Sequence, residues 1–525
     1  MKVRVRLAVV TALALSAGMP LAHAADAPGN AELIKRLNEQ EQRIRALEQK
    51  LAEQQQANGA RAAEANGSEA AASNRSGATT ANGSGAPQQA DNTPAPGEAA
   101  VAQPGASPQG PLTSNSATPV VNARPAGRQF AIESADGSNV IRFRANVQFD
   151  GRWYSDNLTP ATSDTFLLRK VRPYIEGTVD DIYDFRLMPD FGQGKAIVAD
   201  AYVAARFQPW LTVQAGKFKG PVGLERLQPD QYNKFLELGL PSDLVPNRDL
   251  GVQVGGDLLG GTLSYAIGYF DGVTDGNSTD ANTNPDVDND GTKDLEARLF
   301  SQPFIKSANP YLRGFGIGIG GTYVNATGSA TNTLLATYKT AAAQNFFTYR
   351  TGTSATYADG RRERLAPQAF YYAGPFGVLA EYVKSEQEVS RQVSNTVKRS
   401  GEVDNSAWQV TASLFLTGER ASYNTFTPKS TFVPGRPGIG AFEIVARLEE
   451  LRIGDAAFAG GAGSFADPAV SPRKAKAYGV GLNWYPSQYI KIMLDYEHTR
   501  FDGGAAGGGD RPDEKAYLSR FQLAF

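Results

Sequence analysis

Alternation of apolar and polar side chains governs this sequence from Gln129 to the terminal Phe525. Within residues 139–154, one face collects the apolar side chains Ile141, Phe143, Ala145, Val147, Phe149 and Trp153. The other face collects Arg142, Arg144, Asn146, Gln148, Asp150 and Arg152. A period of two is typical of β-strands, because successive side chains point to opposite faces of a sheet. An apolar face can meet lipid while a charged face meets water, so the pattern predicts a transmembrane antiparallel β-barrel, an all-β fold.

A soluble β-sandwich is the alternative, since its strands also have one buried face. The length of the first strand, its many charges and the persistence of the pattern to the chain end favour the barrel. The last strand places Tyr517, Phe521, Leu523 and Phe525 on one face. A terminal aromatic residue after such alternation is typical of the strand that an outer-membrane protein presents to the barrel-assembly machinery. Polar stretches at 272–294, 325–344, 385–405 and 453–474 are expected to be external loops.

The N-terminus predicts export across the inner membrane. Lys2, Arg4 and Arg6 are followed by an apolar stretch and by the small-residue site Ala22-His23-Ala24. This arrangement predicts a signal peptide over residues 1–24, whose apolar stretch is too short to span a membrane. The sequence contains no Cys, which excludes disulfides. We therefore expect the barrel to reside in the bacterial outer membrane.

Two further segments precede the barrel, which we place at 129–525. Residues 31–56 carry a heptad seam, which predicts an α-helical coiled coil; a lone amphipathic helix is the alternative. Residues 57–127 are rich in Ala, Gly, Ser, Asn, Gln and Pro, a composition that predicts a disordered linker. Heptad and linker together are compatible with a structural tether between the barrel and the cell wall.

Catalysis is not expected. His498 is the single histidine after the predicted signal peptide, and no G-x-S-x-G or comparable nucleophile motif is present. The formal net charge of −2 gives no evidence for an anionic solute, and we expect no nucleic-acid partner. Charge placement along the bore must therefore decide what passes.

A series of short motifs resembles the phosphate-selective porin O and P family. The motifs occur in order along 129–525: Phe166 to Gly177, Asp200 to Tyr202, Val213 to Gly223, Pro246 to Arg248, Ala297 to Leu299, Gly374 to Gly377, Ala407 to Gln409, Gly440 to Glu443, Gly481 to Tyr485 and Arg520 to Phe525. The resemblance implies a homotrimer of sixteen-stranded barrels with a third loop folded inward, here Pro221 to Asp249. At about 25 residues per strand and connection, the length of 129–525 also suits about 16 strands.

The resemblance implies passive diffusion of small anions, most of all phosphate or polyphosphate. A phosphate channel needs cationic groups along its bore, and the planar fork of arginine suits phosphate oxygens. Eight residues are candidates for the pore lining: Arg142, Arg144, Arg152, Lys170, Arg172, Lys217, Lys219 and Arg226.

Two observations favour a general or differently selective porin on the same fold. Any wide porin lines its wall with charges of both signs. The expected third loop also contains more acids than bases, and carboxylates facing the bore would favour cations. These acids are Glu225, Asp230, Glu237, Asp243 and Asp249.

A second chemical signal lies between 286 and 294. Three carboxylates at alternating positions, Asp286, Asp288 and Asp290, are followed by Gly291 and by a fourth at Asp294, and this arrangement resembles a calcium-binding loop. The twelfth position of such a loop requires a bidentate Glu, and Ala297 stands there instead. A polar external loop is therefore the alternative to a Ca²⁺ site, and no other cofactor is expected.

Overall fold

The computed structural model describes residues 130–155, 163–282 and 284–525. The predicted signal peptide (1–24), coiled coil (31–56) and linker (57–127) lie outside the described residues. Within the described residues, no helix is both long and apolar enough to cross a membrane.

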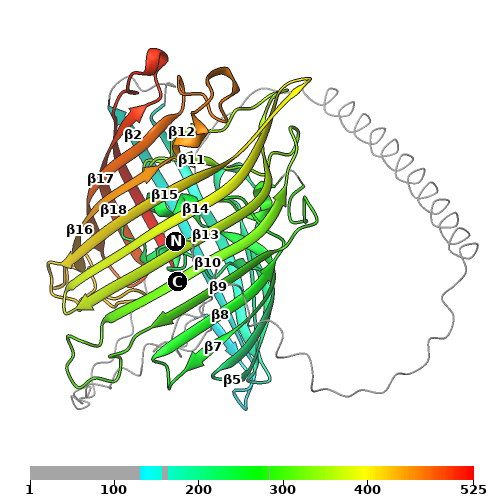
Figure 1. The fold of residues 1–525 in the computed structure, drawn as a ribbon. Coiled ribbons are helices and arrows are strands. Elements are labelled where there is room, and N and C mark those ends of the chain that lie inside the picture. Colours follow the sequence, from blue (N-terminus) through cyan, green and yellow to red (C-terminus); the bar gives the residue numbers. More distant parts are fainter. Residues whose placement is uncertain (1–129, 156–162, 283) are drawn as a thin grey trace, which may run out of the picture. The chain divides into compact units, whose positions relative to one another are not determined.

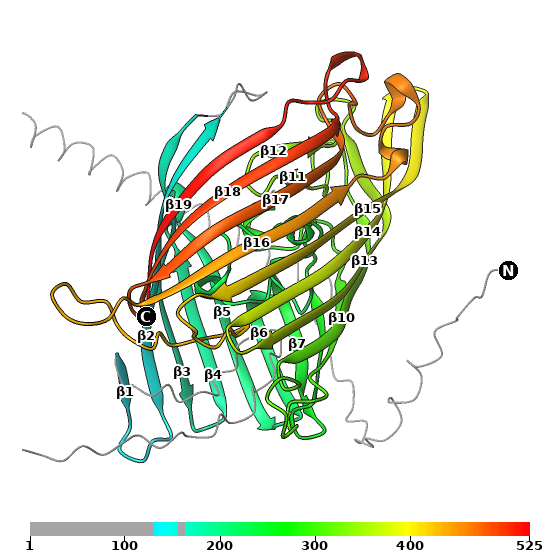
Figure 2. The same ribbon diagram turned by 90° about the vertical axis from the view of Figure 1, so that its left-hand side faces the viewer.

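Sixteen antiparallel strands form a closed barrel (Figures 1 and 2). Each strand pairs with the next, and β19 closes the ring by pairing with β2, where Lys515 faces Ser155. The strands are β2 (Val140–Ser155), β3 (Thr165–Val179), β4 (Tyr183–Asp190), β5 (Ile197–Gln208), β6 (Leu211–Lys219), β7 (Arg248–Leu258), β8 (Leu263–Phe270), β9 (Asp294–Ser301), β10 (Phe315–Thr327), β13 (Thr356–Ala373), β14 (Phe376–Ser394), β15 (Val397–Phe415), β16 (Ala441–Arg452), β17 (Pro472–Tyr485), β18 (Ile490–Gly503) and β19 (Glu514–Ala524). The predicted all-β barrel of about 16 strands is confirmed.

Three minor strands accompany the barrel. Strand β1 (Ala131–Glu133) pairs with the start of β2, and β11 (Thr337–Lys339) pairs with β12 (Asn345–Thr348) in a small separate hairpin. The other described elements are seven short 3-10 turns.

The alternation along β2 has the predicted orientation. Phe143 and Phe149 are 43% and 45% exposed on the outer face, whereas Gln148 and Asp150 are fully buried inside. The outer surface is therefore apolar and the interior polar, as a membrane barrel requires.

The two ends of the barrel differ in their connections. At one end the turns are short; the β3–β4 turn contains Asp180 and Asp181 in the left-handed region, with φ of 50° and 61°. At the other end the connections are long, as in 220–247, 271–293 and 328–355. Short turns face the periplasm in barrels of this kind, so the long connections are external.

One predicted external loop is wrong. Residues 385–405 are mostly strand, because β14 and β15 continue beyond the rest of the wall as a paired hairpin that turns between Ser394 and Val397. Beyond the lipid, the outer face of these strands meets water, while inward side chains such as Val389 and Val403 pack against the loops inside the barrel. The apolar alternation that marks a strand then disappears from the sequence.

The connection between β6 and β7, residues 220–247, is called loop 3 below, and it turns into the barrel. Its apolar side chains, such as Leu240 and Leu244, belong to a buried core inside the barrel. The 328–355 connection contributes Tyr338 and Phe347 to this core, and the 453–471 connection contributes Phe458. The inner wall of β13–β18 completes it, so one side of the interior is filled by loops. The predicted third loop has this position.

Candidate functional site: two charged walls joined by loop 3

Asp230 of loop 3 lies among three cations of the barrel wall. Its carboxylate pairs with Lys170 Nζ at 2.7 Å, with Lys219 Nζ at 3.5 Å and with the Arg172 guanidinium. Arg172 also holds Asp190 at 2.7 Å. Burial alone would raise the pKa of Asp230, but the charges of Lys170, Lys219 and Arg172 hold it well below its ordinary value. Asp230 is therefore a fixed anion in a cationic setting.

A second network continues along the same side of the barrel. Glu176 accepts from Arg144 at 3.2 Å and from Arg186 at 2.7 Å. Asp200 pairs with Arg248 at 2.6 Å and with Arg186 at 3.6 Å. Arg186 thus links the two carboxylates, which gives a continuous chain of charges.

We call these two ion-pair networks, which strands β2–β7 and loop 3 form, the cationic wall. Its cations are Arg144, Lys170, Arg172, Arg186, Lys219 and Arg248, and its carboxylates are Glu176, Asp190, Asp200 and Asp230. Six positive charges therefore meet four negative ones.

Glu237 of loop 3 gathers three arginines beside the cationic wall. Its carboxylate pairs with Arg169 at 2.6 Å and with Arg152, and it lies 3.8 Å from Arg520. Arg520 and Arg152 also share Asp150, at 2.6 Å and 2.9 Å. Burial alone would raise the pKa of Glu237, but Arg169 and Arg152 hold it well below its ordinary value. Both acids that loop 3 presents to this side are therefore neutralised.

A β-bulge explains how Arg169 reaches the interior. Gln148 pairs with Lys170, but the next pair joins Phe149 to Leu168, so Arg169 is the extra residue. A bulge of this kind turns two consecutive side chains to one face. Arg169 and Lys170 consequently both bind loop-3 carboxylates, although strict alternation would send one of them to the lipid.

The opposite wall holds loop 3 by its backbone. Glu381 on β14 accepts the Leu224 N–H at 2.7 Å, and Glu449 on β16 accepts the Leu240 N–H at 2.7 Å. A carboxyl oxygen of Glu is an acceptor for a backbone N–H. These acids fix the course of loop 3.

Arg447 is the main cation of this side. It is buried and pairs with Glu497 at 2.8 Å and with Glu449 at 3.3 Å. Nearby, Glu443 binds Lys234 of loop 3 at 2.6 Å. We call this region, on β14–β18 and loop 3, the acidic wall. Its acids are Glu225, Glu381, Glu443, Glu449, Asp495 and Glu497, and its cations are Lys234, Arg447 and Lys491.

A periplasmic segment also reaches loop 3. The connection 416–440 between β15 and β16 lies at the short-turn end but is long. Its Tyr423 is buried and donates its hydroxyl to the Leu224 carbonyl at 2.6 Å, and Gln228 Nε2 donates to the Tyr423 carbonyl at 2.6 Å. Loop 3 is thus supported from both ends of the barrel.

The eight predicted pore-lining residues fall into different settings. Lys170, Arg172, Lys219 and Arg144 come together in the cationic wall, and Arg152 joins the Glu237 group. Arg142 is partly exposed and makes no ion pair within the described ranges. Lys217 binds Asp280 and Asp286 of the 271–293 loop. Arg226 donates to the Ser242 carbonyl at 2.5 Å. Arg226 therefore braces loop 3 internally.

Four arginines of the cationic wall and of the neighbouring Glu237 group were not among the predicted pore-lining residues: Arg169, Arg186, Arg248 and Arg520. Arg186 and Arg520 stand on strands with clear alternation, so their inward orientation was predictable. Arg186 also lies over the Tyr174 and Tyr202 rings, 5.6 and 5.8 Å from their centroids. Arg169 carried no such signal, because its orientation depends on the bulge.

The four carboxylates of the predicted calcium loop are not brought together. Asp286 pairs with Lys217, Asp288 with Lys293, Asp290 with the Thr292 N–H and hydroxyl, and Asp294 with Arg364. No group of three or more potential ligands is placed to hold a metal ion within the part of the chain that the structure describes. Strand β9 begins at Asp294, which turns that carboxylate into the barrel and away from the loop.

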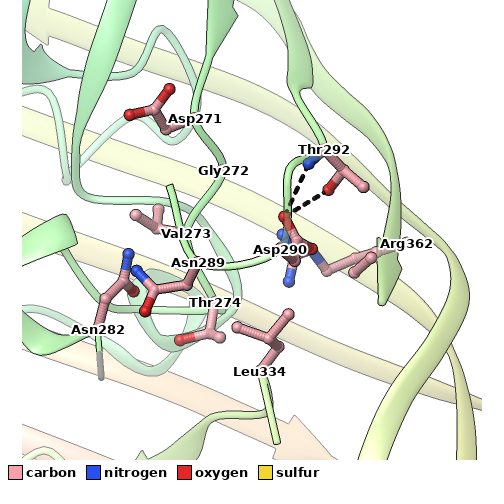
Figure 3. A pocket seen from close by; sticks show the side chains of 11 residues that line it. Asp271, Gly272, Val273, Thr274, Asn282, Asn289, Asp290, Thr292, Leu334 and Arg362 are labelled. Carbon is pink, nitrogen blue, oxygen red and sulfur yellow. Dashed lines mark hydrogen bonds between the residues drawn. The ribbon is translucent and has the colours of Figure 1, made fainter. Parts of the chain in front are cut away.

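A small pocket lies beside this loop, where its residues approach β13. Asp271, Asp290, Thr292 and Arg362 are among its lining residues (Figure 3). One oxygen of the Asp290 carboxylate accepts both Thr292 bonds, at 3.0 and 2.8 Å, and the other accepts the Thr327 N–H of β10 at 3.2 Å, so Asp290 ties its loop to the barrel wall.

His498 lies on β18 near the external end. Tyr478 Oη lies 2.5 Å from His498 Nδ1, and Asp513 lies 2.8 Å from its Nε2. The ring is buried between these partners, in the region expected for the aromatic belt.

Comparison with known proteins agrees with this architecture. The family model described as "Phosphate-selective porin O and P" matches residues 141–525. Porin O of Pseudomonas aeruginosa is 28% identical over 156 residues, which cover 29% of this chain and 33% of that protein. The match thus spans about a third of that relative's length.

Several solved outer-membrane proteins are similar at low identity. The outer-membrane channel DcaP of Acinetobacter baumannii is 10% identical with a TM-score of 0.46, and covers 75% of this chain and 99% of its own. OmpF of Salmonella typhi is 13% identical with a TM-score of 0.44, and covers 75% and 100%. The family match spans nearly the whole barrel, and the chain therefore belongs to the phosphate-selective porin O and P family, as a porin of the bacterial outer membrane.

Proposed function

We propose that this porin conducts small anions by passive diffusion and that phosphate or polyphosphate is its preferred solute. The Asp230 carboxylate is the observation that carries the proposal. An oxyanion attached to loop 3 already occupies a position where Lys170, Arg172 and Lys219 converge. A mobile phosphate presents the same kind of oxygen to the same donors.

The composition of the cationic wall supports passage as well as binding. Its six cations exceed its four carboxylates by two, so the wall attracts anions without an isolated deep site. Each cation already shares a carboxylate, and a solute can exchange with that partner. Binding that is favourable but shared among sites is what conduction requires.

The predicted pore lining is part of this proposal. We assign solute contact to Arg142, Arg144, Lys170, Arg172 and Lys219. Arg152 acts through Glu237, while Lys217 and Arg226 hold loops.

A general porin is the second candidate, and one observation favours it. Asp230 and Glu237 neutralise the cations that a phosphate filter would leave open, and the acidic wall faces them from the other side. Charges of opposite sign on facing walls orient polar solutes without selecting phosphate.

Ion selectivity of the purified protein in a planar bilayer separates these candidates. Under a KCl gradient, we expect the sign of the reversal potential to show that chloride permeates more readily than potassium. We also expect added phosphate to block the chloride current. A potential of the opposite sign would exclude the anion channel, and anion preference without phosphate block would favour the general porin.

Assembly and tethering complete the proposal. We propose a homotrimer in the lipid of the outer membrane, delivered by the barrel-assembly machinery through β19, with residues 31–56 as a coiled coil that ties barrel to cell wall. Deleting 25–127 should leave conductance unchanged and reduce co-sedimentation with peptidoglycan. Unchanged co-sedimentation would contradict the tether alone.

A further inference from the structure

The outer surface of β16–β19 carries an aromatic belt near its external end. Tyr478 and Tyr517 are 38% and 53% exposed, and Trp153 of the adjacent β2 is 38% exposed. Tyr517 pairs in register with Tyr496 and with Trp153, so the rings follow neighbouring strands. Figure 2 shows these strands side by side on one face of the barrel. Such belts mark the level of the lipid headgroups.

A layer of cations lies directly beyond this belt. Strand β17 runs from the external loop 453–471 toward Tyr478, so Lys474 and Lys476 lie on its external side. Lys476 pairs in register with Arg500 of β18, and Lys474 pairs with Arg452 of β16. Arg452, Lys476 and Arg500 lie between buried neighbours and therefore face outward, and Lys474 lies two residues before Lys476 on the same face of β17. We call Arg452, Lys474, Lys476 and Arg500 the outer cationic patch.

The patch has few internal counter-charges. Lys474 lies 3.2 Å from Asp502, and Arg500, whose side chain is 67% exposed, lies 3.6 Å from Asp513. Arg452 and Lys476 form no ion pair with any residue that the structure describes. Glu450, the register neighbour of Lys476, is the remaining acid on the outer face of these strands, because their acids other than Asp502 are buried inside the barrel.

The neighbouring outer surface of β13–β15 is different. Each of its outward cations has an acidic partner: Arg361 pairs with Glu402 at 2.7 Å, Lys384 with Glu386 and Asp404, and Lys398 with Asp359 at 2.7 Å. A positive excess is therefore a property of β16–β19 and not of the whole external rim.

We propose that the outer cationic patch binds the phosphorylated glycolipid of the outer leaflet, through the phosphate groups of its lipid A part. The apolar belt suits its acyl chains, and the cations lie at the level where its phosphates begin. Lysine and arginine just beyond the hydrocarbon bind anionic headgroups, and the guanidinium fork adds paired hydrogen bonds to phosphate. This surface lies outside the bore, so the proposal is independent of the solute.

The test measures lipid A retained by the full-length protein, purified in detergent, by native mass spectrometry. The patch variant is Arg452→Gln/Lys476→Gln/Arg500→Gln, and the matched control is Arg361→Gln/Lys384→Gln/Lys398→Gln, which removes the same charge from β13–β15. We expect bisphosphorylated lipid A to bind the patch variant at least about tenfold more weakly than the wild type, with the control little changed.

Unchanged conductance and heat stability of both variants show that the barrel is intact. Equal retention by the patch variant and the wild type would overturn the proposal, as would an equal loss in the control. Should the patch variant fail to fold, wild-type protein is compared with bisphosphorylated and dephosphorylated lipid A. Equal binding of the two lipids would then overturn the proposal.

Discussion

The cationic wall and the acidic wall hold loop 3 by different chemistry. On the cationic side, the wall supplies guanidinium and ammonium groups, and loop 3 supplies the carboxylates of Asp230 and Glu237. On the acidic side, the wall supplies the carboxylates, and loop 3 supplies mainly backbone N–H groups, as at Leu224 and Leu240, together with the Lys234 ammonium group. A backbone donor carries no formal charge to set against an anion.

This difference assigns different tasks to acids that look alike in sequence. Glu449 fixes the loop, because its removal leaves a buried N–H without an acceptor. Asp230 sets the net charge of the cationic wall, because its removal leaves Lys170, Arg172 and Lys219 without their shared counter-charge. The same residue type therefore controls loop position on one wall and electrostatics on the other.

The largest effect is expected when cations of the cationic wall are removed. Lys170→Gln/Arg172→Gln removes two cations and leaves Asp230 and Asp190 with fewer counter-charges. We expect the anion-to-cation permeability ratio to fall on the order of tenfold, measured by reversal potential in a KCl gradient. The control is Lys384→Gln/Lys398→Gln on the outer face. A similar fall in that control would contradict a local role of the wall.

The second prediction concerns the acidic wall, where Glu449 holds the backbone of loop 3. Glu449→Ala removes the acceptor of the Leu240 N–H, whereas Glu449→Gln keeps an oxygen there. Leaving a buried N–H without an acceptor costs about 1–3 kcal/mol, so the Leu240 amide should exchange with deuterium at least about tenfold faster in the Ala variant. The Gln variant should stay closer to the wild type. Equal exchange in all three proteins would mean that Glu449 does not hold the loop.

A third, smaller effect concerns the periplasmic support of loop 3. Tyr423→Phe removes the hydroxyl that donates to the Leu224 carbonyl at 2.6 Å. The loss of about 1 kcal/mol should increase current fluctuations in single channels without changing the reversal potential. A changed reversal potential would mean that Tyr423 affects the ion selectivity of the bore and would contradict a role limited to supporting loop 3.

The smallest expected effect is a pH dependence at Asp243 of loop 3. Burial raises the pKa of this carboxyl to about 7, against the lowering effect of the Lys339 N–H and Arg226. Its folded pKa lies above its unfolded value, so its contribution to stability falls as pH rises from about 4 to about 7. Asp243→Asn should lose less stability than the wild type between pH 5 and 8, a difference of about 1–2 °C in Tm. Parallel Tm curves would contradict the assignment.

The barrel was predictable because the period of two reports which face meets lipid. Phe143 and Arg144 already reveal the inside and outside of β2. The alternation fails at two kinds of place. At Arg169 a bulge breaks the period, and in 385–405 the strands leave the lipid, so their outer face need not be apolar.

The candidate site was predictable only in its residue types. Lys170 and Arg172 were identified as inward cations, and the acids of loop 3 were identified as groups that would oppose anion selectivity. The pairing of Asp230 with these cations depends on how a loop of 28 residues folds back across the barrel, from Gly220 to Asn247. Such contacts join residues distant in sequence, and local patterns do not encode them.

The most direct test compares one charge removed from each wall. Asp230→Asn and Glu443→Gln each delete one carboxylate, but Asp230 neutralises three cations that line the proposed anion path. We predict that Asp230→Asn shifts the reversal potential further toward chloride than Glu443→Gln does, and that it strengthens block by phosphate. Equal shifts in the two variants, or a shift toward potassium in Asp230→Asn, would contradict the cationic wall as the path of the anion.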